Sequence, residues 1–275
     1  MITVPADLER VIDEAWEATK PTPGYLLENE AKFLGVLAAI TPAQGSIVEI
    51  GSYRGRSTVM LAKVAAHYGC GPIVAIDPHN SPILLGPGSL KRSSYDDFLE
   101  SLRIADIEKH VEPHVAYSSD VSVSWTRPIR LLWIDGDHSY QGAKADFDGF
   151  LPYLAAGGVI ALHDALSNFE GPIRIFVEEM LRSDRFGPAG FVHSIAWAQF
   201  RPADGYKFQA QRERLAERAS KLIDLVEEGQ ELRGLKKMRF KLTRSRVPRF
   251  PLTYRAWATQ LDLSSTETSS TQTPR

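Results

Sequence analysis

Short apolar runs alternate with segments of helical periodicity from residue 46 to residue 181, and this alternation constrains the fold more than any other feature of the chain. The short runs predict strands and the periodic segments predict helices. Such alternation is typical of a parallel sheet with helices on both faces. The predicted strands cover residues 46–50, 72–76, 111–117, 131–134 and 158–162, and the predicted helices cover residues 57–68, 95–104, 140–154 and 173–181.

Four segments are expected along the chain. Apolar residues recur at helical spacing on both sides of the turn sequence PTPG, so residues 1–43 form an N-terminal helical segment. Residues 44–205 form the α/β core, in which residues 191–200 add one or two antiparallel strands. Residues 206–262 form a basic helical extension, and the Ser- and Thr-rich residues 263–275 form a disordered tail. The fold class is therefore α/β, with a doubly wound, Rossmann-like, mainly parallel seven-stranded sheet.

The composition is that of an ordinary globular protein. The 275 residues are 43% hydrophobic and carry a formal net charge of -2, which gives no global argument for nucleic acid or an anionic membrane as a partner. The single cysteine, Cys70, excludes an internal disulfide and fits a reducing compartment. No stretch approaches the roughly 20 apolar residues of a membrane span. We therefore expect a cytoplasmic protein without a membrane partner.

The stretch VEIGSYRGRST spans the turn from the first predicted strand into the first predicted helix, and ligands of doubly wound sheets bind at the carboxyl ends of strands. Gly51 and Gly55 allow a tight turn, while nearby hydroxyls and the amides at the helix start can bind a carboxylate. A dinucleotide fingerprint would need glycines where Tyr53 and Arg56 stand. A nicotinamide-dependent oxidoreductase is therefore the less favoured alternative.

Polar residues also follow the second and third predicted strands. Asp77, at the end of IVAIDPH, can accept hydrogen bonds from both ribose hydroxyls of a nucleoside. The alternative is that Asp77 caps the turn before Pro78. Ser118, Ser119 and Asp120 can contact an adenine edge, although such residues are also common in turns.

The stretch LLWIDGDHSY places two carboxylates and an imidazole after the fourth predicted strand, and ALHD ends the fifth. If the two strands are neighbours, Asp135 and Asp164 face each other and repel unless one is protonated or a cation lies between them. Hard oxygen ligands favour Mg²⁺, with His163 as a third ligand or a partner of the ligands.

His138 follows Asp135 on the turn that enters the next helix. An imidazole there can remove a proton from a hydroxyl group. The alternative for His138 is a hydrogen-bonding role at the helix start, and Asp137 is either a second candidate base or a helix cap.

VEIGSYRGRST, IVAIDPH and LLWIDGDHSYQGAKADFDGFLPYLAAGGVIALHD together resemble the class I S-adenosylmethionine-dependent methyltransferases. More narrowly, they look like the branch with IDGDHSY and a late HD pair, which includes metal-dependent sugar O-methyltransferases of antibiotic and polysaccharide pathways. The resemblance covers about residues 44–185.

The resemblance implies a role for each matching residue. The metal site is Asp135 with Asp164, where His163 departs from the acid usual in the family, and the base is His138, with Asp137 in some relatives. The residues implied in cofactor binding are Glu49, Gly51, Ser52, Tyr53 and Ser57 around the methionine part, Asp77 at the ribose, and Ser119 with Asp120 near the adenine.

The function implied is Mg²⁺-dependent transfer of the methyl group of S-adenosyl-L-methionine to a sugar hydroxyl, in an oligosaccharide, a polysaccharide or a glycosylated natural product. The alternatives are methyl transfer to another hydroxylated metabolite or to RNA, or an iron-dependent hydroxylation, since the same branch includes hydroxylases. Residues 80–94 are expected to form a lid or a mobile surface loop.

A basic run without acidic residues lies in the C-terminal extension. It is either a solvated face, a clamp on the acidic body, or a site for RNA or an acidic partner. Nucleic acid is not expected, because the run lacks the aromatic interleaving that is typical of base stacking. The run consists of Arg233, Lys236, Lys237, Arg239, Lys241, Arg244, Arg246 and Arg249.

The helix predicted over residues 208–229 either packs on its own domain or forms the contact of a homodimer.

Overall fold

The computed structural model describes residues 4–80, 93–226 and 232–249, together with residues 253, 254, 256 and 259. The expected lid, apart from its ends, and the expected tail lie outside these residues. Within the described ranges, no helix is long and apolar enough to cross a membrane.

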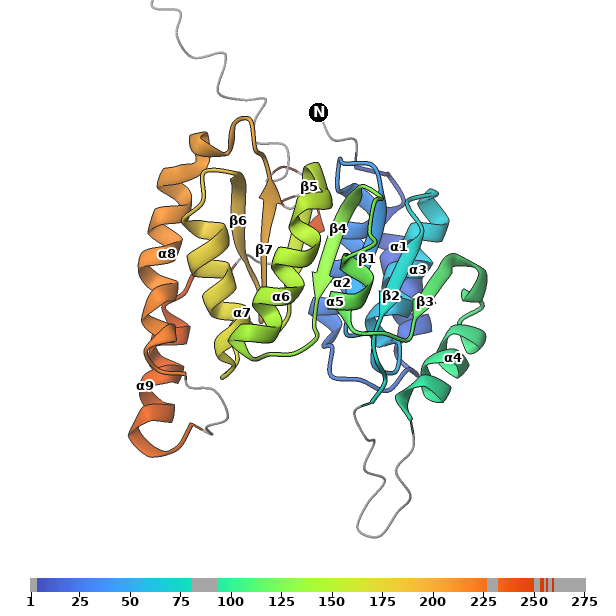
Figure 1. Ribbon diagram of the computed structural model, residues 1–275, viewed down its shortest axis with the longest axis horizontal. Coiled ribbons are helices and arrows are strands. Elements are labelled where there is room, and N and C mark those ends of the chain that lie inside the picture. Colours follow the sequence, from blue (N-terminus) through green and yellow to red (C-terminus); the bar gives the residue numbers. More distant parts are fainter. Residues whose placement is uncertain are drawn as a thin grey trace, which may run out of the picture.

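A seven-stranded sheet in the order β3-β2-β1-β4-β5-β7-β6 forms the centre of the molecule (Figure 1). The pairs from β3 to β5 are parallel, whereas β7 is antiparallel to both β5 and β6. This arrangement confirms the predicted fold class. The strands are β1 (Ser46–Ile50), β2 (Ile73–Ile76), β3 (Val111–His114), β4 (Ile129–Ile134), β5 (Leu154–Leu162), β6 (Phe186–Val192) and β7 (Ile195–Phe200).

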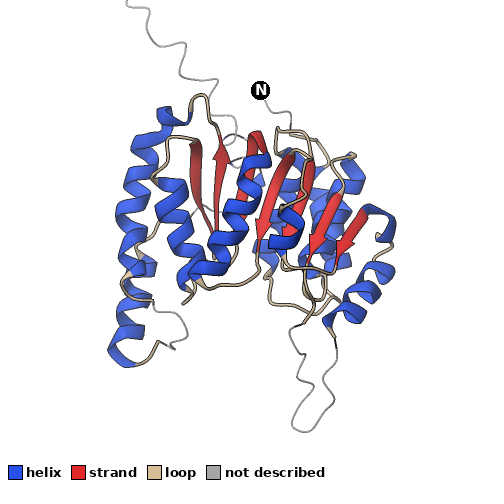
Figure 2. Ribbon diagram, in the orientation of Figure 1, coloured by secondary structure: helices blue, strands red, loops and turns tan. Residues whose placement is uncertain are grey.

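Helices cover both faces of the sheet (Figure 2). Successive strand residues point to opposite faces, so that Leu131 and Trp133 enter one core while Leu132 and Ile134 enter the other. The first core contains α1 (Leu8–Thr19), α2 (Glu28–Ile40), α3 (Arg56–Tyr68) and α4 (Ser94–Ile104). The second contains α6 (Tyr140–Phe150), α7 (Glu170–Arg174) with its π-helical continuation Ile175–Leu181, α8 (Gln209–Ile223) and α9 (Gly234–Ser245). Short helical segments are α5 (Ser118–Ser122), η1 (Glu108–His110), η2 (Leu151–Tyr153) and η4 (Gly205–Phe208).

Several predicted boundaries are wrong, and two of them lie next to each other between α6 and β5. The helix predicted to reach residue 154 ends at Phe150, where a 3-10 turn with Pro152 near its start takes over. The strand predicted to begin at residue 158 begins at Leu154 instead, so that the sequence AAGG lies inside β5. Gly157 adopts a φ of 85° there, and the register with β4 shifts at the same place.

The N-terminal helices are fixed to the core by a buried arginine. Arg130 on β4 is 4% exposed, and its guanidinium donates hydrogen bonds to the carbonyl oxygens of Ala38 (2.7 Å), Thr41 (2.5 Å) and Ala43 (3.0 Å). These carbonyls lie at or just beyond the end of α2, where backbone acceptors lack helical partners. Residues of α2 are therefore held against the sheet and can contribute to a site at its edge.

Candidate active site

A cavity of about 910 Å³ lies at the carboxyl ends of β1, β2, β4 and β5. It has the size of a cleft that encloses a cofactor-sized ligand. Eleven predicted site residues line it, whereas Glu49 and Asp120 do not. The lining includes Gly51, Ser52, Tyr53, Ser57, Asp77, Ser119, Asp135, Asp137, His138, His163 and Asp164.

The turn between β1 and α3 brings the backbone close to the neighbouring strand. Gly51 has a φ of 88°, and a Cβ atom there would lie 2.2 Å from the carbonyl oxygen of Asp135. Only glycine fits both constraints. Ser52, at the same turn, is 2% exposed, and its Oγ has no hydrogen-bond partner among the described residues.

Glu49 is fully buried behind this turn. One carboxylate oxygen, Oε2, accepts a hydrogen bond from the Thr58 hydroxyl, and the other, Oε1, has no partner among the described residues. Burial, assisted by the charges of Asp135 and Asp77, raises the pKa of Glu49 to about 7, against the lowering effect of the Ser57 and Thr58 hydroxyls. A buried acceptor without a partner is costly. An ammonium group that reached it past the turn would satisfy it, and the Ser52 hydroxyl, which lines the cavity, is a second polar group without a described partner, so these residues fit the methionine part of S-adenosylmethionine.

Asp77 is held in place by two backbone amides. Its Oδ2 accepts from the Tyr53 amide and its Oδ1 from the His79 amide, each at 2.7 Å. The second bond is the turn-capping interaction considered for this residue. The first bond ties Asp77 to the turn after β1, so the carboxylate stands at the cavity wall with lone pairs left for ribose hydroxyls.

The segment after β3 contributes through its serines. Ser118 donates a hydrogen bond to Asp146, and Ser119 lines the cavity. Since α5 begins at Ser118, each later residue turns by about 100°, and Asp120 points to solvent. Burial, together with the charge of Asp137, raises the pKa of Asp146 to about 6 although the Ser118 hydroxyl lowers it.

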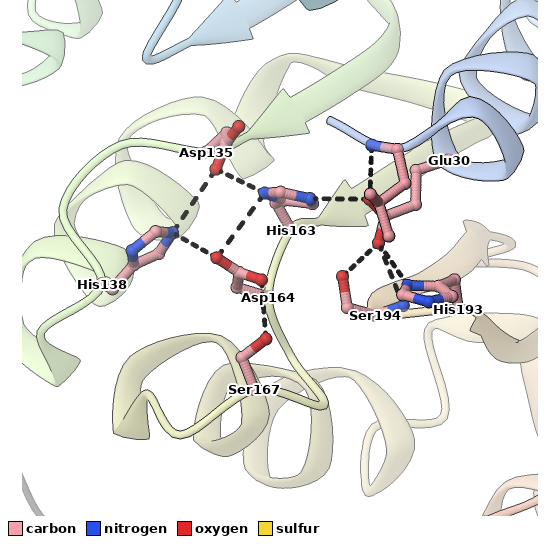
Figure 3. A network of polar contacts seen from close by, with 9 residues as sticks. Glu30, Asp135, His138, His163, Asp164, Ser167, His193 and Ser194 are labelled. Carbon is pink, nitrogen blue, oxygen red and sulfur yellow. Dashed lines mark hydrogen bonds and ion pairs between the residues drawn. The ribbon is translucent and has the colours of Figure 1, made fainter. Parts of the chain in front are cut away.

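A network of carboxylates and imidazoles occupies the ends of β4 and β5 (Figure 3). His163 Nδ1 lies 2.9 Å from Asp135 Oδ1 and 3.8 Å from Asp164 Oδ2. Its Nε2 lies 3.4 Å from Glu30 Oε2 on α2. Burial lowers the pKa of His163, but the charge of Asp135 and the hydrogen bonds with Asp135 and Glu30 outweigh it and raise the pKa to about 11.

Glu30 is the functional residue that the sequence analysis missed. It is 2% exposed and accepts hydrogen bonds from the amides of Leu27 (3.0 Å) and Ser194 (3.2 Å), and it lies 2.9 Å from His193 Nδ1. Burial raises its pKa, but His163 and the Ser194 hydroxyl lower it to about 2. Glu30 is therefore a charged group, anchored on every side, that fixes the orientation of His163.

The predicted metal ligands do not fit Mg²⁺ in this arrangement. Both ring nitrogens of His163 face carboxylate oxygens, which raise the pKa of the imidazole to about 11, so both nitrogens carry protons and neither offers a lone pair to a metal ion. Among the described residues, no group of three His, Cys, Asp or Glu side chains is placed to hold a metal ion. The positive imidazole itself occupies the position in which the sequence predicts a cation.

His138 directs a buried ring nitrogen at the same two carboxylates. Its Nε2 lies 3.4 Å from Asp135 Oδ1 and 3.9 Å from Asp164 Oδ2, and it has no hydrogen-bond partner among the described residues. The ring stacks on Phe169 at 4.4 Å. Asp137, in contrast, uses both oxygens to accept from the amide and hydroxyl of Ser139, at 2.9 and 3.0 Å. This geometry favours His138 as the base and a local turn-forming role for Asp137.

The strand order with its antiparallel β7, the glycine turn after β1 and the acid after β2 define a class I S-adenosylmethionine-dependent methyltransferase. Residues 48–165 match the family described as a methyltransferase domain. This segment contains every predicted site residue, and the chain therefore contains a methyltransferase domain.

Solved structures share this fold over most of their length. The cofactor-bound structure of Rv0187 from MTB is 21% identical with a TM-score of 0.51, over 70% of this chain and 90% of that chain. The O-methyltransferase TomG from Streptomyces achromogenes, involved in tomaymycin synthesis and solved with S-adenosylmethionine, is 18% identical with a TM-score of 0.50, over 73% and 92%. At these identities the similarity concerns the fold.

Asp77→Asn is expected to weaken binding of S-adenosylhomocysteine roughly tenfold to a hundredfold, because it removes a charged acceptor at the cavity wall. Isothermal titration calorimetry measures the change. Asp120→Asn is the matched control, since this exposed carboxylate lies outside the cavity lining and its loss is expected to leave the affinity unchanged. Equal effects of the two substitutions would contradict the assignment of Asp77.

Asp146 is expected to make the free energy of unfolding fall as the pH rises from about 4 to about 6. The folded-state pKa is about 6 against an ordinary value of 3.8, so the folded protein binds the proton more tightly and loses this advantage on deprotonation. Asp146→Asn keeps an acceptor for Ser118 but cannot ionise. Urea unfolding of the cofactor-free protein across this pH range should show the variant gaining stability relative to the parent, and parallel curves would refute the prediction.

Proposed function

We propose that the protein is an O-methyltransferase that methylates a sugar hydroxyl, in an oligosaccharide, a polysaccharide or a glycosylated natural product. The observation that carries the proposal is the position of the buried His138 Nε2 at the cavity wall, where no described residue hydrogen-bonds to it and Asp135 and Asp164 lie 3.4 and 3.9 Å away. An imidazole so placed accepts the proton of a hydroxyl group brought next to it. Bound S-adenosylmethionine supplies an activated methyl group on a sulfonium ion.

The mouth of the cavity suits the apolar face of a sugar ring. Tyr25 is 85% exposed and stacks with Tyr53 at 6.3 Å, and Phe169 is 37% exposed beside His138. All three rings line the cavity. Aromatic walls with a few convergent polar groups are typical of small-molecule sites. They support a ring-shaped acceptor whose hydroxyl reaches His138.

The chain contributes orientation and proton removal. The acceptor must be held in line with the methyl group, since alignment supplies most of the catalysis for a donor this reactive. The acceptor hydroxyl would lose its proton to His138 Nε2 as it takes up the methyl group, whose bond to the sulfonium sulfur would break to leave a neutral thioether. Asp135 and Asp164, 3.4 and 3.9 Å away, stabilise the resulting positive imidazole. No step of this proposal passes through Mg²⁺. The cytoplasmic location and the homodimer stay predictions.

His138→Gln is expected to lower kcat by roughly 10²–10⁴-fold, the usual contribution of a positioned general base. Cofactor affinity should stay nearly unchanged, because the ring lies on the acceptor side of the cavity. The assay transfers labelled methyl groups to a panel of mono- and oligosaccharides.

Asp137→Asn serves as the neighbouring comparison, since both its oxygens bind Ser139. It is expected to affect kcat far less than His138→Gln. A larger loss in Asp137→Asn would transfer the role of base to that carboxylate. Methylation of an RNA or of a sugar-free phenol, with no sugar in the panel accepted, would overturn the sugar assignment.

Methyl transfer is expected to persist in a chelator, because His163 already places positive charge between the predicted metal ligands. The measurement compares kcat after exhaustive chelation with kcat after adding Mg²⁺ back, and monitors the melting temperature in both states. Activity that disappears with the chelator and returns with Mg²⁺ would show that His163 rearranges to admit the ion.

A further inference from the structure

Helix α9 buries one face and exposes a second apolar one. Phe240, 5% exposed, packs into the second core. On the opposite side, Leu235, Met238 and Leu242 are 74%, 60% and 53% exposed. At 100° per residue these three residues lie within an arc of about 60°, turned away from Phe240. They form an outward apolar stripe, unlike singly scattered surface residues.

A basic hollow lies beside this stripe. It has a volume of about 580 Å³, and its walls come from α8, α9 and the segment that follows α9. Within the described part of the chain, none of its five cationic side chains lies within ion-pair distance of a carboxylate. These five residues are Arg218, Lys241, Arg244, Arg246 and Arg249.

Backbone contacts position several of these cations. The Arg218 and Arg249 guanidinium groups donate to the carbonyl oxygens of Arg246 and Arg244, each at 3.4 Å. Burial and the charge of Arg244 lower the pKa of Arg249, as expected where like charges gather. An anion in the hollow would relieve this repulsion. A clamp on the acidic body of the protein would need ion pairs between these five residues and carboxylates, and the described ranges contain none.

The apolar stripe and the basic hollow form one continuous surface. On the helical wheel of α9, Lys241 and Ser245 lie between Met238 and Arg244, and both line the hollow. Figure 1 shows α9 at one end of the molecule, packed beside α8. A single partner can therefore contact aliphatic side chains and unpaired cations at once.

We infer that this surface docks on an anionic lipid bilayer. The apolar stripe enters the boundary between headgroups and acyl chains, and the basic hollow binds lipid phosphates. RNA would use the cations but not an aliphatic stripe, since it binds on aromatic platforms. A symmetric contact with a second copy would bring two sets of unpaired cations together.

This inference departs from the expectation of no membrane partner, which rested on the lack of a spanning segment and on the net charge of -2. A helix lying in the interface needs neither 20 apolar residues nor a basic chain overall, only a local face. The contact would also lie near the active site. Arg244 Nη1 donates to the carbonyl oxygen of Leu166 at 3.3 Å, two residues beyond Asp164.

The test is co-sedimentation of the full chain with vesicles of phosphatidylcholine alone or with about 30% phosphatidylglycerol. We expect binding only to the anionic vesicles, weakening with added salt. Arg218→Gln with Arg249→Gln should weaken it at least roughly tenfold, since each cation near a charged bilayer contributes about fivefold. Leu235→Asn with Leu242→Asn should weaken it comparably, with methyl transfer in solution retained.

Matched controls separate the surface from general charge and hydrophobicity. Arg182→Gln with Lys109→Gln removes the same charge from exposed positions elsewhere, and Ile104→Asn with Val123→Asn removes exposed apolar side chains elsewhere. Both should bind as the parent does.

Three results would overturn the inference. They are equal binding to neutral vesicles, loss of binding in the control pairs, and vesicle binding that survives the Leu235 and Leu242 substitutions while inorganic phosphate abolishes it. The last result would leave a phosphate site without a bilayer surface.

Discussion

The contact between Glu30 and His163 joins the N-terminal helices to the catalytic edge of the sheet. A buried carboxylate on α2 lies 3.4 Å from one ring nitrogen of His163, and Asp135 lies 2.9 Å from the other. Buried charges are stable only when each is paired and hydrogen-bonded. Glu30 meets this condition through the amides of Leu27 and Ser194. The position of α2, held by Arg130, thus determines the electrostatics of a site that otherwise belongs to the methyltransferase domain.

The same contact explains how two carboxylates can face one crevice. Asp135 and Asp164 would repel each other at close range, and the sequence suggested a metal ion as the remedy. The structure supplies two imidazoles instead. Burial raises the pKa of Asp135, but the charge of His163 and contacts with both histidines outweigh it and lower the pKa. His163, fixed by Glu30, places positive charge beside both carboxylates, and the proposed base His138 lies next to the same pair.

The sequence predicted the strands and the residues at their carboxyl ends because both are local patterns. An apolar run followed by Asp77, or by Asp135 and His138, is visible without knowledge of distant contacts. Strand neighbours follow from the doubly wound topology, so the approach of Asp135 to Asp164 was also predictable. The orientation of His163 was not, since it depends on a partner 133 positions away. The outward turn of Asp120 depended on where α5 begins, which sequence patterns locate poorly.

Both missed carboxylates share a sequence signal that could have found them. Glu30 stands three residues before Phe33 and four before Leu34, so it shares a buried face of α2 with them. Asp146 stands between Ala143, Phe147 and Phe150 in the same way on α6. A carboxylate at a position that helical periodicity assigns to the core must find a partner there or change its pKa. Glu30 contacts His163, and its pKa falls to about 2. Asp146 contacts only the Ser118 hydroxyl, and its pKa rises to about 6. A carboxylate that breaks an apolar helical face therefore indicates a buried polar contact, and in Glu30 that contact extends the site to a segment outside the recognisable motifs.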